Sequence, residues 1–228
     1  MAVTTYKNIQ DRVTDILSKN DSTTINRIKN WINMGYSDFV LREQWPFREA
    51  VGDISTVQGT QEYTLSTEFT DIDENNITSV TLQGANNKKL TYWPYQQLRA
   101  NAPDFDQAGQ AVPRRYYLKS GKIGLWPVPN AVYTVTVDYY KVPTELSADS
   151  DEPIIPVNYR ESLVHYALAM EHDFNTDPDL AIKSENKYEQ KVTLARNNLL
   201  AQPNDTGAFT ILGPAHSKDW LGLPGEGV

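Results

Sequence analysis

Hydrophobic residues recur every three or four positions near both ends of the chain, a spacing typical of amphipathic helices. The first such stretch covers residues 4–19. The second follows the cap residues Asp21-Ser22-Thr23 and should end before Pro46, because the residue before a proline disfavours the α conformation. The same spacing returns in 157–174 and 178–200. The apolar positions of these four predicted helices are Tyr6, Ile9, Val13, Ile16, Leu17, Ile25, Ile28, Ile32, Tyr36, Phe39, Leu163, Ala167, Met170, Phe174, Ala181, Tyr188, Val192, Ala195 and Leu199.

Between the helical stretches the hydrophobic period changes to two, which is typical of strands. One pair of strands is predicted at 49–57 and 61–66, and another at 77–83 and 88–93. A short helix is expected at 94–101, since Pro94 is favourable in a first turn, and a loop then leads to residue 113.

Residues 113–142 are predicted to form a β-meander. A hairpin turns at Ser120-Gly121, and a third strand follows it. In that strand two sets of side chains should face opposite ways, as in a sheet with one buried side. The first set is Tyr133, Val135, Val137 and Tyr139, and the second is Thr134, Thr136, Asp138 and Tyr140.

Two further segments have neither period. Residues 143–156 carry four acidic side chains and no basic one, which favours a linker. Residues 201–228 combine three prolines and five glycines with apolar side chains that need a surface to bury against. We expect this arm to contact a neighbouring molecule, although docking on its own domain stays an alternative. The predicted interface residues are Phe209, Ile211, Leu212, Trp220, Leu221 and Leu223.

The predicted fold class is therefore α+β. We expect a discontinuous four-helix bundle, formed by 1–46 and 157–200, because helices from opposite ends of a chain share a core only when the middle is inserted. The inserted antiparallel β domain covers 47–142, the linker 143–156 and the extended arm 201–228.

Composition narrows the range of functions. The formal charge of −8 disfavours a surface that binds nucleic acid, which needs an excess of lysine and arginine. The absence of cysteine excludes disulfides and thiolate chemistry. No apolar run is long enough to cross a bilayer, so no membrane partner is expected, and residues 1–5 lack the pattern of a signal peptide. We expect the protein to be made in the cytoplasm.

Candidate reactive groups are few. His165 and His172 share a helix face, but the third histidine, His216, lies in the arm, so three convergent ligands are not expected. Asp71 to Asn75 resembles the start of a calcium loop, yet Asn76 and Leu82 occupy positions where that loop needs glycine and an acid. The sequence has no motif typical of a catalytic nucleophile or of a phosphate-binding loop. Glu43, close to Trp45, is one of many acids, and nothing in the sequence marks any two of them as a catalytic pair. We predict no catalytic, cofactor or metal site.

Aromatic residues are concentrated in the predicted β domain. Their favoured role is in the core and at interfaces, because tyrosine and tryptophan are enriched at both; stacking on sugars or bases is the alternative. The residues are Tyr92, Trp93, Tyr95, Tyr116, Tyr117, Trp126, Tyr139 and Tyr140.

The order of several short motifs resembles one known family across nearly the whole chain. The motifs are Trp45-Pro46-Phe47, Gly59 to Leu65, Gly121 to Pro129, Tyr139 to Pro143 and Ile155-Pro156. In this order they are similar to the head-to-tail adaptors of short-tailed bacteriophages, also called tail tubular protein A or head completion proteins.

The resemblance implies a structural role in the virion, after assembly in the host cytoplasm. Such adaptors form a ring of twelve beneath the portal protein, support a nozzle or tail-hub protein, and continue the channel through which DNA passes without sequence-specific binding. Their helical part contacts the portal, and their C-terminal segment reaches a neighbour or the portal. The alternatives are a carbohydrate-binding tail module and a muralytic tail enzyme.

Overall fold

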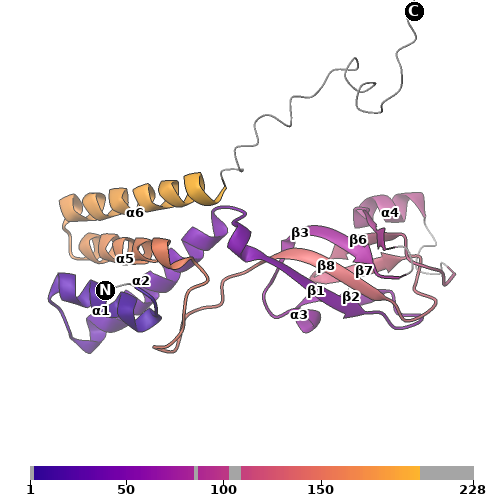
Figure 1. Cartoon of the computed structure of the whole chain (residues 1–228), viewed down its shortest axis with the longest axis horizontal. Helices are drawn as coiled ribbons and strands as arrows, with labels where there is room; N and C mark the ends of the chain where they lie inside the picture. Colours follow the sequence, from indigo (N-terminus) through magenta and orange to yellow (C-terminus); the bar gives the residue numbers. More distant parts are fainter. Residues whose placement is uncertain (1–2, 85–86, 103–108, 201–228) are drawn as a thin grey trace, which may run out of the picture.

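The computed structural model describes residues 3–84, 87–102 and 109–200. The molecule is elongated, with the long helices at one end and two β-sheets at the other (Figure 1). This mixture of helix and sheet confirms the predicted α+β class.

Four long helices occupy the helical end. Thr5 forms a capping box with Asn8 at the first, and the Asp21 carboxylate caps the second at the Thr24 N–H. Asp177 caps the fourth, which opens with Pro178. The helices are α1 (Tyr6–Leu17), α2 (Ser22–Leu41), α5 (Glu161–Phe174) and α6 (Pro178–Leu199), with short 3-10 turns η1 (Pro46–Arg48) and η3 (Val157–Tyr159).

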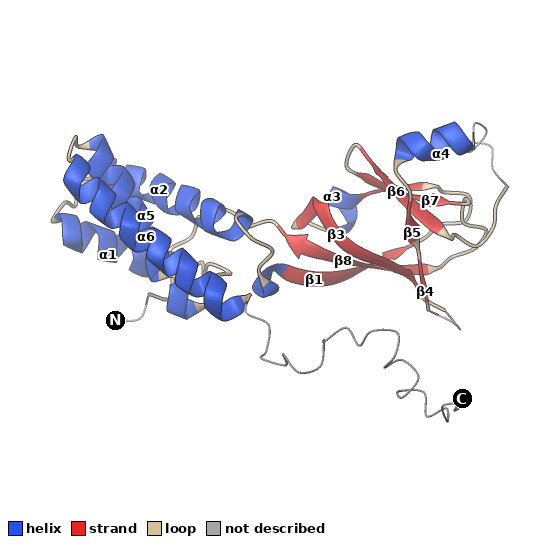
Figure 2. Cartoon of the chain, turned by 90° about the horizontal axis from the view of Figure 1, so that it is seen from above, coloured by secondary structure: helices blue, strands red, loops and turns tan. Residues whose placement is uncertain are grey.

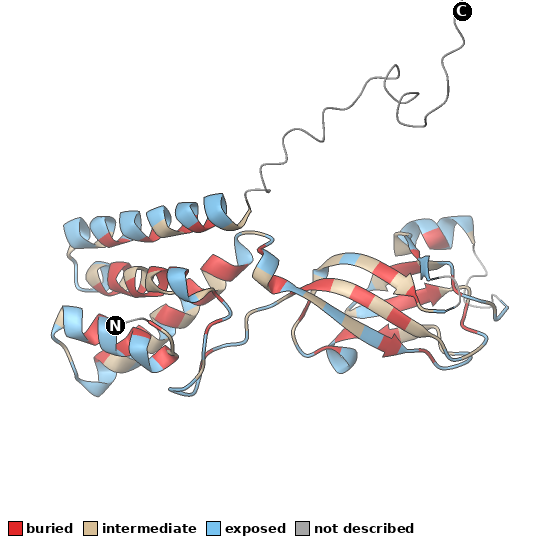
Figure 3. Cartoon of the chain, in the orientation of Figure 1, coloured by how far each residue is buried: buried red, intermediate tan, exposed pale blue. Residues whose placement is uncertain are grey.

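All four helices contribute to one hydrophobic core. In α6 the buried residues Ser184, Tyr188, Val192 and Ala195 follow one face, and the opposite face is exposed (Figure 3). Two residues of the predicted apolar faces do not belong to the core. Ile16 is 49% exposed near the end of α1 and Phe174 is 58% exposed at the end of α5.

Within the described residues, eight strands form two four-stranded sheets at the other end (Figure 2). The first sheet has the order β1 (Glu49–Ser55), β8 (Thr134–Lys141), β3 (Ile72–Leu82) and β4 (Lys88–Lys89). The second has the order β2 (Glu62–Thr64), β7 (Lys122–Trp126), β6 (Arg115–Lys119) and β5 (Thr91–Tyr92). Two short helices accompany them, α3 (Leu65–Glu68) and α4 (Tyr95–Asn101).

The predicted meander is wrong beyond its hairpin. Strands β6 and β7 pair as expected around Ser120 and Gly121, but β8 lies in the other sheet, between β1 and β3. Pro127 and Pro129 explain the change, because proline has no N–H to continue a ladder and the chain crosses to the other sheet there. The face assignment within β8 holds for Val135, Val137 and Tyr139, which are buried.

The predicted pairing of the earlier strands also needs correction. Strand β1 pairs with β8, and β2 pairs with β7, so the two strands around 58–60 are not partners. Strands β3 and β4 do pair, whereas β5 joins the other sheet and lies parallel to β6. All other pairings are antiparallel.

The two sheets enclose a second hydrophobic core between them. It combines Ile54, Val80 and Val137 of the first sheet with Ile123 and Leu125 of the second. The outer side of the second sheet is covered by α4, where Leu98 packs with Tyr117 in a smaller cluster. Alternate residues of each strand therefore point into the shared core or outward.

A short segment connects the two ends of the molecule. The indole of Trp45 is fully buried, stacks on Phe39 and Phe47, and donates to the Phe39 carbonyl at 2.8 Å. Three residues later, the Arg48 guanidinium donates to the Lys141 carbonyl at 2.9 Å, the Glu43 carbonyl at 3.1 Å and the Asp73 carboxylate at 3.0 Å. Arg48 thereby links the end of α2, β3 and the end of β8.

Residues 143–156 contain no helix or strand, yet they are held against the helices. The Asn33 side chain donates to the Leu146 carbonyl and accepts from the Leu146 N–H, each at 3.0 Å. The Tyr6 N–H donates to the Asp151 carbonyl at 2.8 Å, and Leu146 and Ile155 are buried in the helical core. The acidic segment is thus part of the packed helical end.

Replacing Arg48 with methionine should destabilise the protein strongly. The side chain is 2% exposed, and Arg48→Met removes its hydrogen bonds to two part-buried carbonyls and to the Asp73 carboxylate. We expect a loss of about 2–4 kcal/mol in the free energy of unfolding, measured by urea denaturation. The control is Lys7→Met, which removes an exposed ion pair with Asp11 and should cost less than about 1 kcal/mol. Equal losses in the two variants would contradict this role of Arg48.

Candidate functional site

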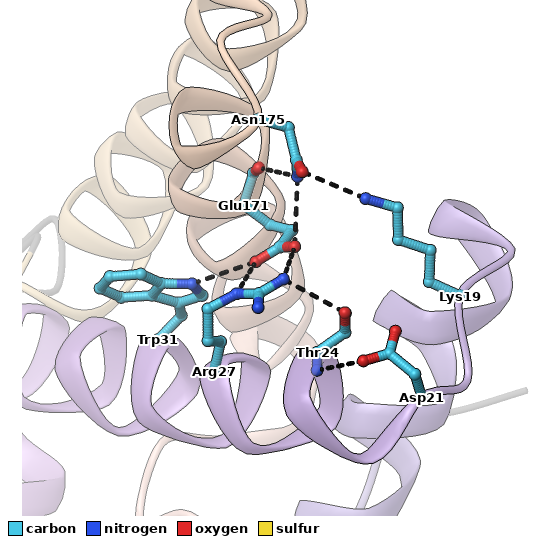
Figure 4. Close-up of polar contacts among 7 residues, drawn as sticks. All are labelled: Lys19, Asp21, Thr24, Arg27, Trp31, Glu171 and Asn175. Carbon is cyan, nitrogen blue, oxygen red and sulfur yellow. Dashed lines mark hydrogen bonds and ion pairs between the residues drawn. The ribbon is translucent and has the colours of Figure 1, made fainter.

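The most elaborate buried polar cluster joins α2 to the end of α5 (Figure 4). The Glu171 side chain is fully buried. Its Oε1 accepts from Arg27 Nη2 at 2.7 Å and from Asn175 Nδ2 at 3.2 Å. Its Oε2 accepts from Arg27 Nε at 3.2 Å and from Trp31 Nε1 at 3.4 Å. Both carboxylate oxygens are therefore occupied.

The surroundings of Glu171 keep it ionised. Burial acts to raise the pKa of its carboxyl group, but the hydrogen bonds from Arg27, Asn175 and Trp31 outweigh burial and hold the pKa below its ordinary value. Arg27 is itself fixed by a bond to Thr24 Oγ1 at 3.1 Å. Both carboxylate oxygens are bonded to side chains of α2 and to Asn175, so this cluster ties α5 to α2.

The predicted histidine pair does not form a metal site in the described part of the chain. His165 is partly buried, burial lowers the pKa of its imidazole, and its Nδ1 has no hydrogen-bond partner there. It lines a groove of about 530 Å³ between α1 and α6, beside Arg12, Lys187 and Lys191. Among the described residues no three His, Asp or Glu side chains gather to hold an ion, and His216 lies outside them.

The acids that resemble a calcium loop have protein partners instead. Asp71 accepts from the Tyr139 hydroxyl at 3.0 Å and forms an ion pair with Lys141 at 3.3 Å. Asp73 accepts from Arg48 and from the Asn76 amide, at 3.0 and 2.7 Å. Glu43, the acid beside Trp45, forms an ion pair with Arg196.

Most of the aromatic residues of the β-sheets lie against other side chains. Tyr116 and Tyr139 are buried in the core between the sheets. The Arg115 guanidinium lies 3.6 Å from the ring centre of Trp93 and 5.4 Å from that of Trp126, so a cation covers these indoles. Tyr92 is 47% exposed.

The predicted interface residues of the arm lie outside the described residues, as does the whole of 201–228. They are Phe209, Ile211, Leu212, Trp220, Leu221 and Leu223. Their role stays a prediction.

Sequence reasoning missed the two best-connected polar side chains, Arg48 and Glu171. A signal existed for Glu171, which lies four residues after Ala167 on the apolar side of its helix. An acid at such a position is buried only when it is paired. Arg48 gives no such signal, because its partners are distant in sequence.

The fold and its polar contacts are those of an elongated α+β protein with two packed cores. Its buried charged side chains, Arg48 and Glu171, hold helices and strands together. The model of the SU10 adaptor protein family matches residues 4–213, and the chain belongs to this family of bacteriophage adaptor proteins. The family confirms the resemblance to phage adaptors and makes the protein a structural one. A comparison with curated proteins found no match. Among the described residues, every helix is too short or too polar to span a bilayer.

Removing the Glu171 carboxylate should destabilise the helical end in a pH-dependent way. At neutral pH, Glu171→Ala should lower the free energy of unfolding by about 2–4 kcal/mol, because Arg27 and Trp31 lose their acceptor. The folded state depresses the pKa, so the stabilisation is fully present above the ordinary value of 4.5 and is lost as the pH falls through the lower folded value.

Denaturation of both proteins across this pH range tests the cluster. The difference between the native protein and Glu171→Ala should shrink below pH 4.5. The exposed acid Glu185 supplies the control, and Glu185→Ala should stay within about 0.5 kcal/mol at every pH. A pH-independent difference for Glu171→Ala would show that the ion pair is not its cause.

Proposed function

We propose that this protein is the head-to-tail adaptor of a short-tailed phage. In this function twelve copies form a ring between the portal protein and a nozzle or tail-hub protein, and the ring continues the DNA channel. The observation that carries the proposal is the adaptor family match, which covers residues 4–213. It extends over both the helical end and the sheets.

The elongated shape supports a joint between two partners. The helical core and the core between the sheets lie at opposite ends of the molecule (Figure 1). We assign the helices α1, α2, α5 and α6 to one discontinuous bundle that contacts the portal, and the sheets to an inserted domain that forms ring contacts. Helix α6 ends beside the junction of the helices and the sheets, where Leu200 lines a pocket with Arg48 and Asn76, so the arm begins there.

The net charge supports passage of DNA without sequence-specific binding. Twelve copies with a formal charge of −8 each carry a charge on the order of −100. Acids on the channel wall repel phosphate and keep the duplex from adhering, while basic residues are better placed at contacts between subunits.

Shortening the chain after Leu200 tests the role of the arm. We expect the shortened protein to fold, because both described cores lie before residue 201. It should be lost from purified virions by about tenfold or more, since six apolar contacts are removed. Incorporation is measured as copies per packaged head by quantitative mass spectrometry.

Full-length variants distinguish the loss of the apolar side chains from the loss of the arm itself. Changing the six apolar residues to serine should reproduce the loss, whereas changing the polar residues Gln202, Asn204 and Thr210 to alanine should not. Normal incorporation of the serine variant would contradict the assigned interface. A chain that hydrolyses peptidoglycan or binds polysaccharide, and is dispensable for joining heads to tails, would contradict the adaptor function. The changed residues are Phe209, Ile211, Leu212, Trp220, Leu221 and Leu223.

A further inference from the structure

The first β-sheet has an acidic outer face. Ile54, Val135 and Val137 point into the core between the sheets, so the alternate residues of β1 and β8 point outward. Four pairs of outward residues lie directly opposite each other across the two strands. They are Glu49 with Tyr140, Val51 with Asp138, Asp53 with Thr136, and Ser55 with Thr134. We call the surface formed by Glu49, Val51, Asp53, Thr136 and Asp138 the acidic face.

The acids of this face have hydroxyl partners or none among the described residues. Asp53 accepts from Thr136 at 2.6 Å and Glu49 accepts from Tyr140 at 3.5 Å. No lysine or arginine of the described chain forms an ion pair with Glu49, Asp53 or Asp138. The uncompensated carboxylates leave the face negative.

The acidic face is hollowed and contains an exposed apolar side chain. Val51 is 65% exposed, although it lies directly opposite Asp138. Around it is a shallow hollow of about 590 Å³, lined also by Glu49 and Thr78. An apolar centre with a charged rim is the usual composition of a protein contact surface.

The outer side of the second sheet carries basic residues around the part that α4 covers. Tyr116, Ile123 and Leu125 enter the core between the sheets, so Arg115, Lys119 and Lys122 lie on the other side of β6 and β7. Lys122 is 46% exposed even though it pairs with Glu62 at 3.5 Å. Lys119 donates to the Tyr95 hydroxyl of α4 at 3.1 Å. Arg115, Lys119 and Lys122 form what we call the basic face.

The sequence shows how uneven the charge is. Between positions 88 and 122 the chain has seven lysines and arginines and only two acids, Asp104 and Asp106. The rest of the chain has 14 basic and 27 acidic residues. Within this basic segment Arg115, Lys119 and Lys122 belong to the second sheet and Arg99 to α4, whereas Lys88 and Lys89 form β4 at the edge of the first sheet.

We propose that the acidic face of one copy docks on the basic face of the next copy around the ring. The two faces lie on opposite sides of one shared core, so a single copy can offer both at once (Figure 2). A symmetric pairing of like faces would oppose like charges, which is costly. Head-to-tail contact between unlike faces instead repeats around an axis and generates a ring. This inference rests on the proposed ring and names its contact surfaces.

Reversing the charges of one face at a time tests the contact. Asp53→Lys with Asp138→Lys, and separately Lys119→Glu with Lys122→Glu, should each lower the number of copies per packaged head by about tenfold or more. The four changes together restore opposite charges and should recover incorporation to within about threefold of the native protein.

The control changes the charge equally, away from both faces and from the helices assigned to the portal contact. Glu68→Lys with Asp149→Lys alters two exposed acids and should leave incorporation unchanged. Normal incorporation of both single-face variants would overturn the proposal. Failure of the fourfold variant to recover, with its fold intact by circular dichroism, would equally count against it and would favour another acidic partner for the basic face.

Chemical cross-linking gives an independent test, because the native chain has no cysteine. A protein with Val51→Cys and Lys122→Cys, assembled on heads and treated with a short bis-maleimide, should give a ladder of covalent multimers up to twelve. Val51→Cys with Glu185→Cys should remain monomeric. Heads that contain the protein but give no ladder would overturn the proposed contact and leave the adaptor function standing. Absence of the native protein from heads would instead contradict the adaptor function.

Discussion

The buried guanidinium of Arg48 is the interaction on which the arrangement of the whole molecule depends. The chain leaves the helices just before Arg48, builds both sheets, and returns to the helices just after Lys141, whose carbonyl accepts from Arg48. The same side chain holds the Glu43 carbonyl and the Asp73 carboxylate. Exit and return are thereby fixed at one place, and a long β segment can be inserted without disturbing the helical core.

The helical end needs a second constraint, because its helices come from opposite ends of the chain. Glu171 supplies it by connecting α5 to Arg27 and Trp31 of α2. The acidic segment after β8 is held in the same way by Asn33. These polar contacts hold α5 and the acidic segment against α2.

Local periodicity predicts much of this fold and explains where prediction fails. The helices follow from spacing and caps, since both depend on neighbouring residues. The pairing of β8 with β1 cannot be predicted in this way, because β1 lies some 80 positions away and the residue pattern of neither strand identifies its partner. The start of β3 at Ile72 is hidden by four polar residues and a bulge before Ser79. The ion pairs of Arg48 and Glu171 are long-range contacts of the same kind, and the predicted arm residues lie outside the described part of the chain.

Charge gives the clearest link from sequence to assembly. In the proposed ring, the acidic total favours a channel through which DNA moves freely, and the cations of β6 and β7 favour contacts between copies. Electron microscopy of purified virions, with this chain traced in the density, tests the adaptor function most directly. The predicted result is twelve copies around the DNA channel between portal and tail, each with its acidic face against the basic face of a neighbour. Density for the chain at a fibre or spike, or no density at the neck, would contradict it.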